Sequence, residues 1–291
     1  MDDLSMDLRR LCRRSKNGSF GTRKNRERGL AAISLELKAL GYKLPSARSL
    51  KPKHVTALVE KWQCADLGND TIKNRLAWVR WWAENVNKAS VVPRTNEELG
   101  IITRAVPANR AMVLEPSQLS RIRDVYVKGA LLLQAAFGLR REEAIKFRPV
   151  YADQDSFIRL KASWTKGGRA RNVPITSKHQ REVLDLVKRI ARDGALIPPG
   201  KTYVSQLKRY ERETLSVALR KTHGLRHRYA QKRFRVLAGF ACPLEGGKTR
   251  REMTPQEREA DRAARMRVSR ELGHNRLSVT DTYLGSAEHD G

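Results

Sequence analysis

Four short stretches of the sequence carry residues that could act on a phosphodiester. They are GLRREE (138–143), TKGGRARNVPI (165–175), HGLRHRY (223–229) and LGHNRLSVTDTYL (272–284). Attack on a phosphodiester adds negative charge to its non-bridging oxygens, and guanidinium groups stabilise that charge because they are always charged and bind bidentately. Arg140 and Arg226 could therefore stabilise it without a metal ion.

Other residues of these stretches could supply the nucleophile and the proton transfers. Tyr283 carries a phenol that must lose its proton as it attacks, and nearby arginines and a histidine favour that loss. His223 and His274 could donate hydrogen bonds or move the proton. Lys166, in a Lys-Gly-Gly turn, could protonate the sugar oxygen as it leaves, so that it departs as a hydroxyl. The resulting phosphotyrosine ester would store the energy of the broken bond, so a hydroxyl could reform the phosphodiester without ATP.

Each of these residues also has a purely structural interpretation. Arg140 could form an ion pair with Glu143 at a helix end, and Lys166 could simply occupy a turn. His274 could cap a helix, and Tyr283 could fill a core. The occurrence of all these residue types in one chain favours chemistry over coincidence.

The charge of the chain indicates its partner. The 291 residues include 59 Lys and Arg against 31 Asp and Glu, which gives a formal net charge of +28. Such a charge attracts polyanions, and double-stranded DNA is the partner we expect. The longest apolar runs, such as ALLLQAAFGL (130–139), are too short to span a membrane. We expect a soluble, cytoplasmic, nucleoid-associated protein with no membrane partner.

The cysteines and histidines do not form a metal-binding pattern. Cys12, Cys64 and Cys242 are odd in number and widely separated, which argues against disulfides and against a cysteine zinc site. His223 and His227 are four positions apart, as paired metal ligands on a helix are, but HGLRH lacks the glutamate of the His-Glu-x-x-His motif. We expect no metal and no other cofactor.

The N-terminal third has a helical pattern throughout. Apolar residues recur at helical spacing over 21–42, with Thr22 as the expected N-cap, over 49–63 and over 69–86. The last of these helices carries Lys73, Arg75 and Arg80 away from its apolar face, and these cations are either DNA contacts or a solvated surface. The overall charge favours DNA contact.

A linker is expected after these helices. The stretch from about Lys88 to Leu114 contains prolines and shows no sustained period. We place the domain boundary near Pro107, with one domain over 1–106 and a second over 107–291.

The second domain is predicted to be mainly helical with a small β-sheet or hairpin. A strongly apolar helix over 128–147 is interrupted near Gly138, and a β-hairpin with a basic tip is predicted over 155–175. Further helices are expected over 178–192, over 204–220, from about Thr222, and over 254–273, where Thr254 and Glu257 form a capping box.

Taken in order, the four stretches resemble the active site of the tyrosine recombinase, or phage integrase, family. In that family an arginine after Gly-Leu, a hairpin lysine, a His-x-x-Arg box, a Leu-Gly-His and a tyrosine near the chain end follow one another. The resemblance is specific over about 113–285, and the N-terminal domain is only loosely similar to the family's core-binding domain. It implies a helical DNA-binding domain followed by an α+β catalytic domain.

The resemblance also implies residue roles. The implied catalytic set is Arg140, Lys166, His223, Arg226, His274 and Tyr283, with Tyr283 as the nucleophile. Glu143 matches an acidic position that supports the site. On the basic hairpin, Arg169 and Arg171 are expected to contact DNA.

One departure from the family pattern is clear. Arg226 and His274 are 48 residues apart, roughly twice the separation that the resemblance leads us to expect. The extra length forms a charged insertion at about 241–265, which is expected to extend the helix before His274 and to touch DNA or a neighbouring subunit.

The expected function is site-specific recombination, through a covalent 3′-phosphotyrosine intermediate, for integration or excision of a mobile element. The resemblance implies a homo-oligomer, a tetramer on DNA, with accessory DNA-bending or directionality proteins. Three alternatives stay open: a resolvase of chromosome or plasmid dimers, a type IB-like topoisomerase, and an inactive DNA-binding accessory protein with the same fold.

Overall fold

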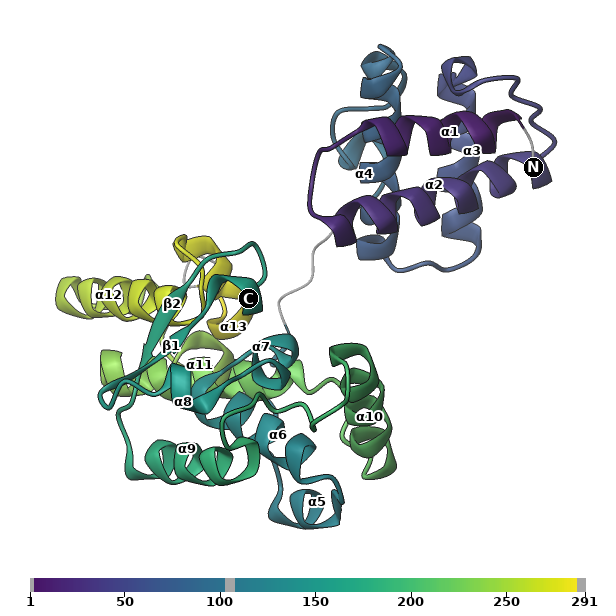
Figure 1. The fold of residues 1–291 in the computed structure, drawn as a ribbon. Coiled ribbons are helices and arrows are strands. Elements are labelled where there is room, and N and C mark those ends of the chain that lie inside the picture. Colours follow the sequence, from purple (N-terminus) through teal and green to yellow (C-terminus); the bar gives the residue numbers. More distant parts are fainter. Residues whose placement is uncertain (1–2, 103–107, 287–291) are drawn as a thin grey trace. The chain divides into compact units, whose positions relative to one another are not determined.

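The computed structural model describes residues 3–102 and 108–286. The chain divides into two compact units, Met1–Ala105 and Val106–Gly291 (Figure 1). Pro107, where the sequence places the boundary, lies outside the described residues. Each unit has its own hydrophobic core.

The first unit is helical. Its α-helices are α1 (Asp3–Arg14), α2 (Phe20–Ala39), α3 (Pro52–Cys64) and α4 (Asn69–Asn85). Their apolar faces enclose a core that includes Trp62 and Trp82. The expected cap at Thr22 is wrong, because α2 begins earlier and the Thr22 N–H donates to Ser19 Oγ at 3.2 Å.

The segment expected to be a linker is ordered up to Ile101. It contains the 3₁₀ helices η2 (Ala89–Val91) and η3 (Glu97–Leu99), and Ile101 is fully buried in the core of the first unit. Arg80 of α4 binds this segment, donating to the carbonyl of Pro93 at 3.1 Å. The segment is thus anchored to the first unit through the buried Val92 and Ile101, although many of its other side chains are exposed.

The second unit is mainly helical, with one two-stranded antiparallel sheet in its described part. Its α-helices are α5 (Pro116–Arg121), α6 (Val125–Phe137), α7 (Arg141–Ile145), α8 (Pro149–Ala152), α9 (Lys178–Ala191), α10 (Tyr203–Ser216), α11 (His223–Ala238), α12 (Pro255–Glu271) and α13 (Asp281–Leu284). Strands β1 (Phe157–Leu160) and β2 (Arg171–Pro174) pair with Leu160 opposite Arg171. The predicted hairpin is confirmed.

A glycine separates α6 from α7. Gly138 ends α6 in the left-handed conformation, with φ of +62°, and its N–H donates to the Gln134 carbonyl. A Cβ at this position would lie 2.4 Å from Tyr229 Cδ1, so both the backbone and the packing require glycine. The turn places Arg140 at the start of α7.

The charged insertion provides the start of α12. Thr254 Oγ1 accepts the Glu257 N–H at 3.2 Å, which confirms the predicted capping box. Before α12 lies a short 3₁₀ helix, η5 (Pro243–Glu245). None of the described helices is both long enough and apolar enough to cross a lipid bilayer.

Candidate active site

Tyr283 is buried inside the second unit. It lies on α13, which packs against α11, and only 5% of its surface is exposed. Its hydroxyl accepts a hydrogen bond from Arg226 Nε at 3.2 Å, and its carbonyl accepts one from Gln231 at 3.1 Å. The hydroxyl is therefore fixed beside a guanidinium of its own chain.

Arg226 joins three of the four stretches. It lies on α11 and has no exposed surface. Besides Tyr283, it donates to the Gly138 carbonyl at 2.6 Å and to the Leu272 carbonyl. Burial is the largest cause that lowers its pKa, to about 10, so the guanidinium stays charged at neutral pH.

Arg140 lies on the more open side of this arrangement. One of its terminal nitrogens lies 2.9 Å from Glu143 Oε1, and the other lies 3.1 Å from His274 Nε2. Since a guanidinium only donates, His274 Nε2 accepts, and the ring proton is on Nδ1. The Arg140 side chain is 18% exposed, so it can still meet a ligand from solvent.

Three histidine rings surround the tyrosine ring. The centroid of the Tyr283 ring lies 4.7 Å from that of His227, 6.1 Å from His223 and 6.3 Å from His274. We define the Tyr283 cluster as Arg140, Glu143, His223, Arg226, His227, His274 and Tyr283. In the sequence, His227 suggested only a possible metal ligand, although its spacing from His223 already places both on one face of a helix.

The histidines of the cluster are neutral at pH 7. Burial lowers the pKa of His274 to about 4, helped by the charges of Arg140 and Arg226. Burial also lowers the pKa of His227 to about 4, and that of His223 to a lesser extent. A neutral imidazole has one nitrogen that can accept a proton, and in His274 that nitrogen already accepts from Arg140. His223 and His227 are therefore the rings available as a base.

Glu143 organises the arginines. Its carboxylate is fully buried and accepts from the Arg140 N–H at 2.8 Å and from both terminal nitrogens of Arg171, at 2.9 and 2.7 Å. Burial opposes its ionisation, but the hydrogen bonds and charge of Arg171 outweigh that effect and lower its pKa to about 2. The carboxylate is thus permanently ionised at neutral pH.

Arg171 does not lie where a DNA contact was expected. Its side chain is only 6% exposed, and besides Glu143 it donates to the Glu271 carbonyl at 2.8 Å. It shares a face of β2 with the buried Val173, because strand residues two apart point the same way. Arg171 supports the cluster from within.

Lys166 and Arg169 lie apart from the cluster. Both are exposed in the turn that joins β1 to β2. Within residues 3–102 and 108–286, no hydrogen bond or ion pair joins Lys166 to the cluster. Their predicted roles therefore depend on a bound DNA.

The cations of α4 are partly engaged within the first unit. Arg75 pairs with Glu36 at 2.7 Å and lies over the Trp62 ring at 5.3 Å, so its charge is compensated. Arg80 is bound by the segment around Pro93, as described above. Lys73 is half-buried. This face is less openly basic than the sequence suggests.

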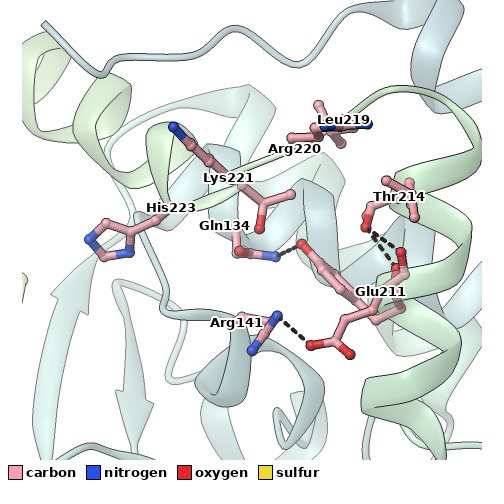
Figure 2. A pocket seen from close by; sticks show the side chains of 11 residues that line it. Gln134, Arg141, Glu211, Thr214, Leu219, Arg220, Lys221 and His223 are labelled. Atoms are coloured by element: carbon pink, nitrogen blue, oxygen red, sulfur yellow. Dashed lines mark hydrogen bonds and ion pairs between the residues drawn. The ribbon is translucent and has the colours of Figure 1, made fainter. Parts of the chain in front are cut away.

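A cavity of about 550 Å³ adjoins the cluster at His223 (Figure 2). Lys221 and His223 lie on one side of it, and Arg141 lies across from them, paired with Glu211 at 3.0 Å. Gln134 donates to the Tyr210 hydroxyl at 2.8 Å, deeper in the unit. In the part of the chain that is described, no group of three or more His, Cys, Asp or Glu side chains could hold a metal ion.

Two family models match the sequence. The model described as phage integrase, N-terminal, matches residues 1–91, and the model described as integrase matches residues 102–232. The chain belongs to the phage integrase family of tyrosine recombinases. The second match ends before His274 and Tyr283, so the places of these two residues come from the structure. A comparison with curated proteins finds no match.

Solved structures of tyrosine recombinases share the fold. The Tn1549 transposon integrase (residues 82–397) in complex with circular intermediate DNA has a TM-score of 0.60 at 15% identity, covering 100% of this chain and 97% of that one. XerH site-specific recombinase bound to palindromic difH substrate has a TM-score of 0.58 at 16% identity, and the match covers 96% of this chain and 80% of that one. A lambda integrase tetramer bound to a Holliday junction has a TM-score of 0.61 at 13% identity, and the match covers 98% of this chain and 78% of that one. At identities this low, the structural similarity establishes a common fold and no more than that.

The pKa values of the buried histidines predict acid sensitivity. The pKa of His227 is about 4 in the folded protein against an ordinary value of 6.5, so the unfolded chain takes up a proton first as the pH falls. Its contribution to stability is complete above pH 6.5 and is lost as the pH falls through about 4. We expect the melting temperature to fall between pH 7 and pH 4.5, and to fall less in His227→Phe.

The control is His179→Gln, which changes an exposed histidine of α9. Its melting temperature should fall between the two pH values by as much as that of the parent protein. An equal loss in His227→Phe would contradict the assignment of acid sensitivity to His227.

Proposed function

We propose that this tyrosine recombinase cleaves and rejoins DNA at a specific site through a 3′-phosphotyrosine intermediate, for integration or excision of a mobile element. The observation that carries the proposal is the hydrogen bond from Arg226 to the Tyr283 hydroxyl inside a cluster of arginine and histidine side chains. Residues of three separate stretches meet there. The first unit would be the core-binding domain (1–106), and the second the catalytic domain (107–291).

The two arginines have different roles in this proposal. Arg140, which is partly exposed, meets the non-bridging oxygens of the phosphate together with His223 and His274. Arg226 lies behind them, where it stabilises the negative charge that develops on the Tyr283 oxygen. Preorganised donors of this kind need no rearrangement as the charge forms.

The chemical step is a transfer of the phosphoryl group. Tyr283 Oη attacks the phosphorus, its proton passes to a neutral histidine, and the bond to the 5′-oxygen breaks. The anionic phosphate raises the pKa of the nearby histidines, which makes them better bases than in the free protein. Lys166 protonates the departing 5′-oxygen once DNA engages the β1–β2 turn. Resealing runs the same steps in reverse, with a 5′-hydroxyl as the nucleophile.

DNA binding extends beyond the cluster. The cavity at His223 has Arg141 and Lys221 on facing sides, which suits the phosphates next to the cleaved one (Figure 2). Lys73 and Arg169 would add further phosphate contacts. The solved structures named above contain DNA, and one is a tetramer on a Holliday junction. They support DNA binding and assembly as a tetramer on DNA here. The chain would act on nucleoid DNA in the cytoplasm, together with accessory DNA-bending or directionality proteins.

The test is a suicide substrate made from the DNA that flanks the gene. A nick beside the cleavage site lets the short product diffuse away and traps the covalent complex. Because the guanidinium groups of Arg140 and Arg226 supply the positive charge, we expect the complex to form equally in EDTA and in magnesium. Loss of the complex in EDTA, with recovery in magnesium, would contradict the proposal.

A further inference from the structure

The insertion at 241–265 lies against both ends of the tyrosine helix. Arg265, at the end of the insertion, contacts Asp281, the first residue of α13. Pro243 and Leu244, near the start of the insertion, lie against Gly285, the residue that directly follows α13. The family resemblance assigns this extra length no role. Its contacts with α13 suggest one.

Arg265 joins the insertion to the amino end of α13. Its side chain is only 5% exposed. Its Nε donates to both carboxylate oxygens of Asp261, each at 2.9 Å, and one terminal nitrogen donates to Asp281 Oδ1 at 3.1 Å. Asp261 orients the guanidinium from within α12, so the bond to Asp281 has a fixed direction. Asp281 is two residues before Tyr283.

Leu244 and Pro243 lie at the carboxyl end of α13. Gly285 has φ of +84°, and a Cβ there would lie 3.0 Å from Pro243 Cβ and 3.1 Å from the Leu244 N. The Leu244 carbonyl accepts from Asn109 at 3.0 Å, and Asn109 in turn accepts from Gln231 at 2.9 Å. Gln231 also donates to the Tyr283 carbonyl. The chain after Tyr283 therefore packs against the 3₁₀ helix η5.

The tyrosine helix needs such support. It has four residues, Asp281–Leu284, and so short a helix is unstable by itself because nucleation is costly. The position of Tyr283 thus depends on what holds α13. A displacement of about 1 Å in a reacting group can slow a reaction on the order of 10²-fold.

We infer that the insertion is a clamp that positions Tyr283 for attack, with Arg265 and Asp281 as positioning residues at one end and Leu244 and Gly285 at the other. The inference rests on the proposed function, since it concerns the nucleophile of that reaction.

The insertion also reaches α11, where its Glu245 pairs with Arg228 at 2.8 Å and with Arg235 at 3.2 Å. The bond from Arg265 to Asp281 acts on α13, so a change at Asp281 is expected to leave the phosphate-binding residues in place.

The first experiment measures single-turnover cleavage of the suicide substrate by Asp281→Asn. Asparagine keeps the size of the side chain and its capacity to accept at the start of α13, but it removes the charge that Arg265 binds. We expect cleavage to slow by about 10- to 100-fold, with DNA affinity unchanged and with Asp281→Glu recovering most of the rate. The matched control is Glu259→Gln, which removes a charge from an exposed position of α12 and should cleave at the parental rate.

The second experiment tests whether Asp281→Asn affects only the position of Tyr283 or also disturbs the phosphate-binding residues. In a Tyr283→Phe protein, added hydroperoxide can attack the phosphorus in place of the phenol, so cleavage then reports only the phosphate-binding residues. Adding Asp281→Asn to Tyr283→Phe should leave this cleavage unchanged. A further loss there would overturn the inference, as would a parental cleavage rate in Asp281→Asn. If the parent itself forms no covalent complex, the proposed function fails instead.

Discussion

Arg226→Lys is expected to slow formation of the covalent complex by about 10²- to 10³-fold, the usual effect of losing one preorganised donor to a developing charge. Lysine keeps the positive charge but cannot reproduce three directed hydrogen bonds, to Tyr283, Gly138 and Leu272. The Tyr283 oxygen would lose its fixed partner. Single-turnover cleavage of the suicide substrate measures the effect.

The control for Arg226→Lys is Arg181→Lys. Arg181 lies on α9 and pairs with Asp153 at 2.5 Å, so the substitution makes the same chemical change outside the cluster. It should cleave at nearly the parental rate. Because Arg226 has no exposed surface, DNA affinity should be the same in all three proteins. Parental cleavage by a folded Arg226→Lys protein would contradict the role given to Arg226.

Lys166→Ala is expected to cleave ordinary DNA about 10²- to 10⁴-fold more slowly, the range for a lost general acid. Sulfur in place of the bridging 5′-oxygen removes the need for an acid, because a thiol has a pKa of about 8.5 and the sulfur leaves as a thiolate without a proton. Lys166→Ala should therefore cleave the sulfur substrate nearly as fast as the parent does. The measurement is the cleavage rate of Lys166→Ala and of the parent protein on each of the two substrates.

The Lys166 experiment has two controls. Lys161→Ala removes another exposed lysine from the same hairpin and should be normal on both substrates. Tyr283→Phe should be inactive on both, since no leaving group replaces a missing nucleophile. If Lys166→Ala is equally slow on both substrates, Lys166 binds phosphate instead, and His223 and His274 become the candidates for the acid.

The helices and the order of the motifs could be predicted from the sequence because both depend on local patterns. Apolar residues at helical spacing locate α2, α3 and α4, and the capping box locates the start of α12. The resemblance to tyrosine recombinases predicts which residues of distant stretches meet. Arg226 and Tyr283 do meet, by a direct hydrogen bond.

The partners of individual cations could not be predicted in the same way. Arg171 and Arg75 read as surface charges, but tertiary packing brings each of them to a carboxylate, Glu143 and Glu36. The alternation of β2 was available as a signal for Arg171, since Val173 is plainly apolar and shares its face. Nothing in the sequence pairs Arg75 with Glu36, which lies 39 positions away on another helix.

The most direct test is to identify the residue that carries the DNA in the trapped complex. Protease digestion of the complex, followed by mass spectrometry, should find the 3′-phosphate of the cleaved strand on the peptide that contains Tyr283, joined through its phenol oxygen. Tyr283→Phe should give no such adduct. An adduct on any other residue, or an undiminished complex in Tyr283→Phe, would contradict the account.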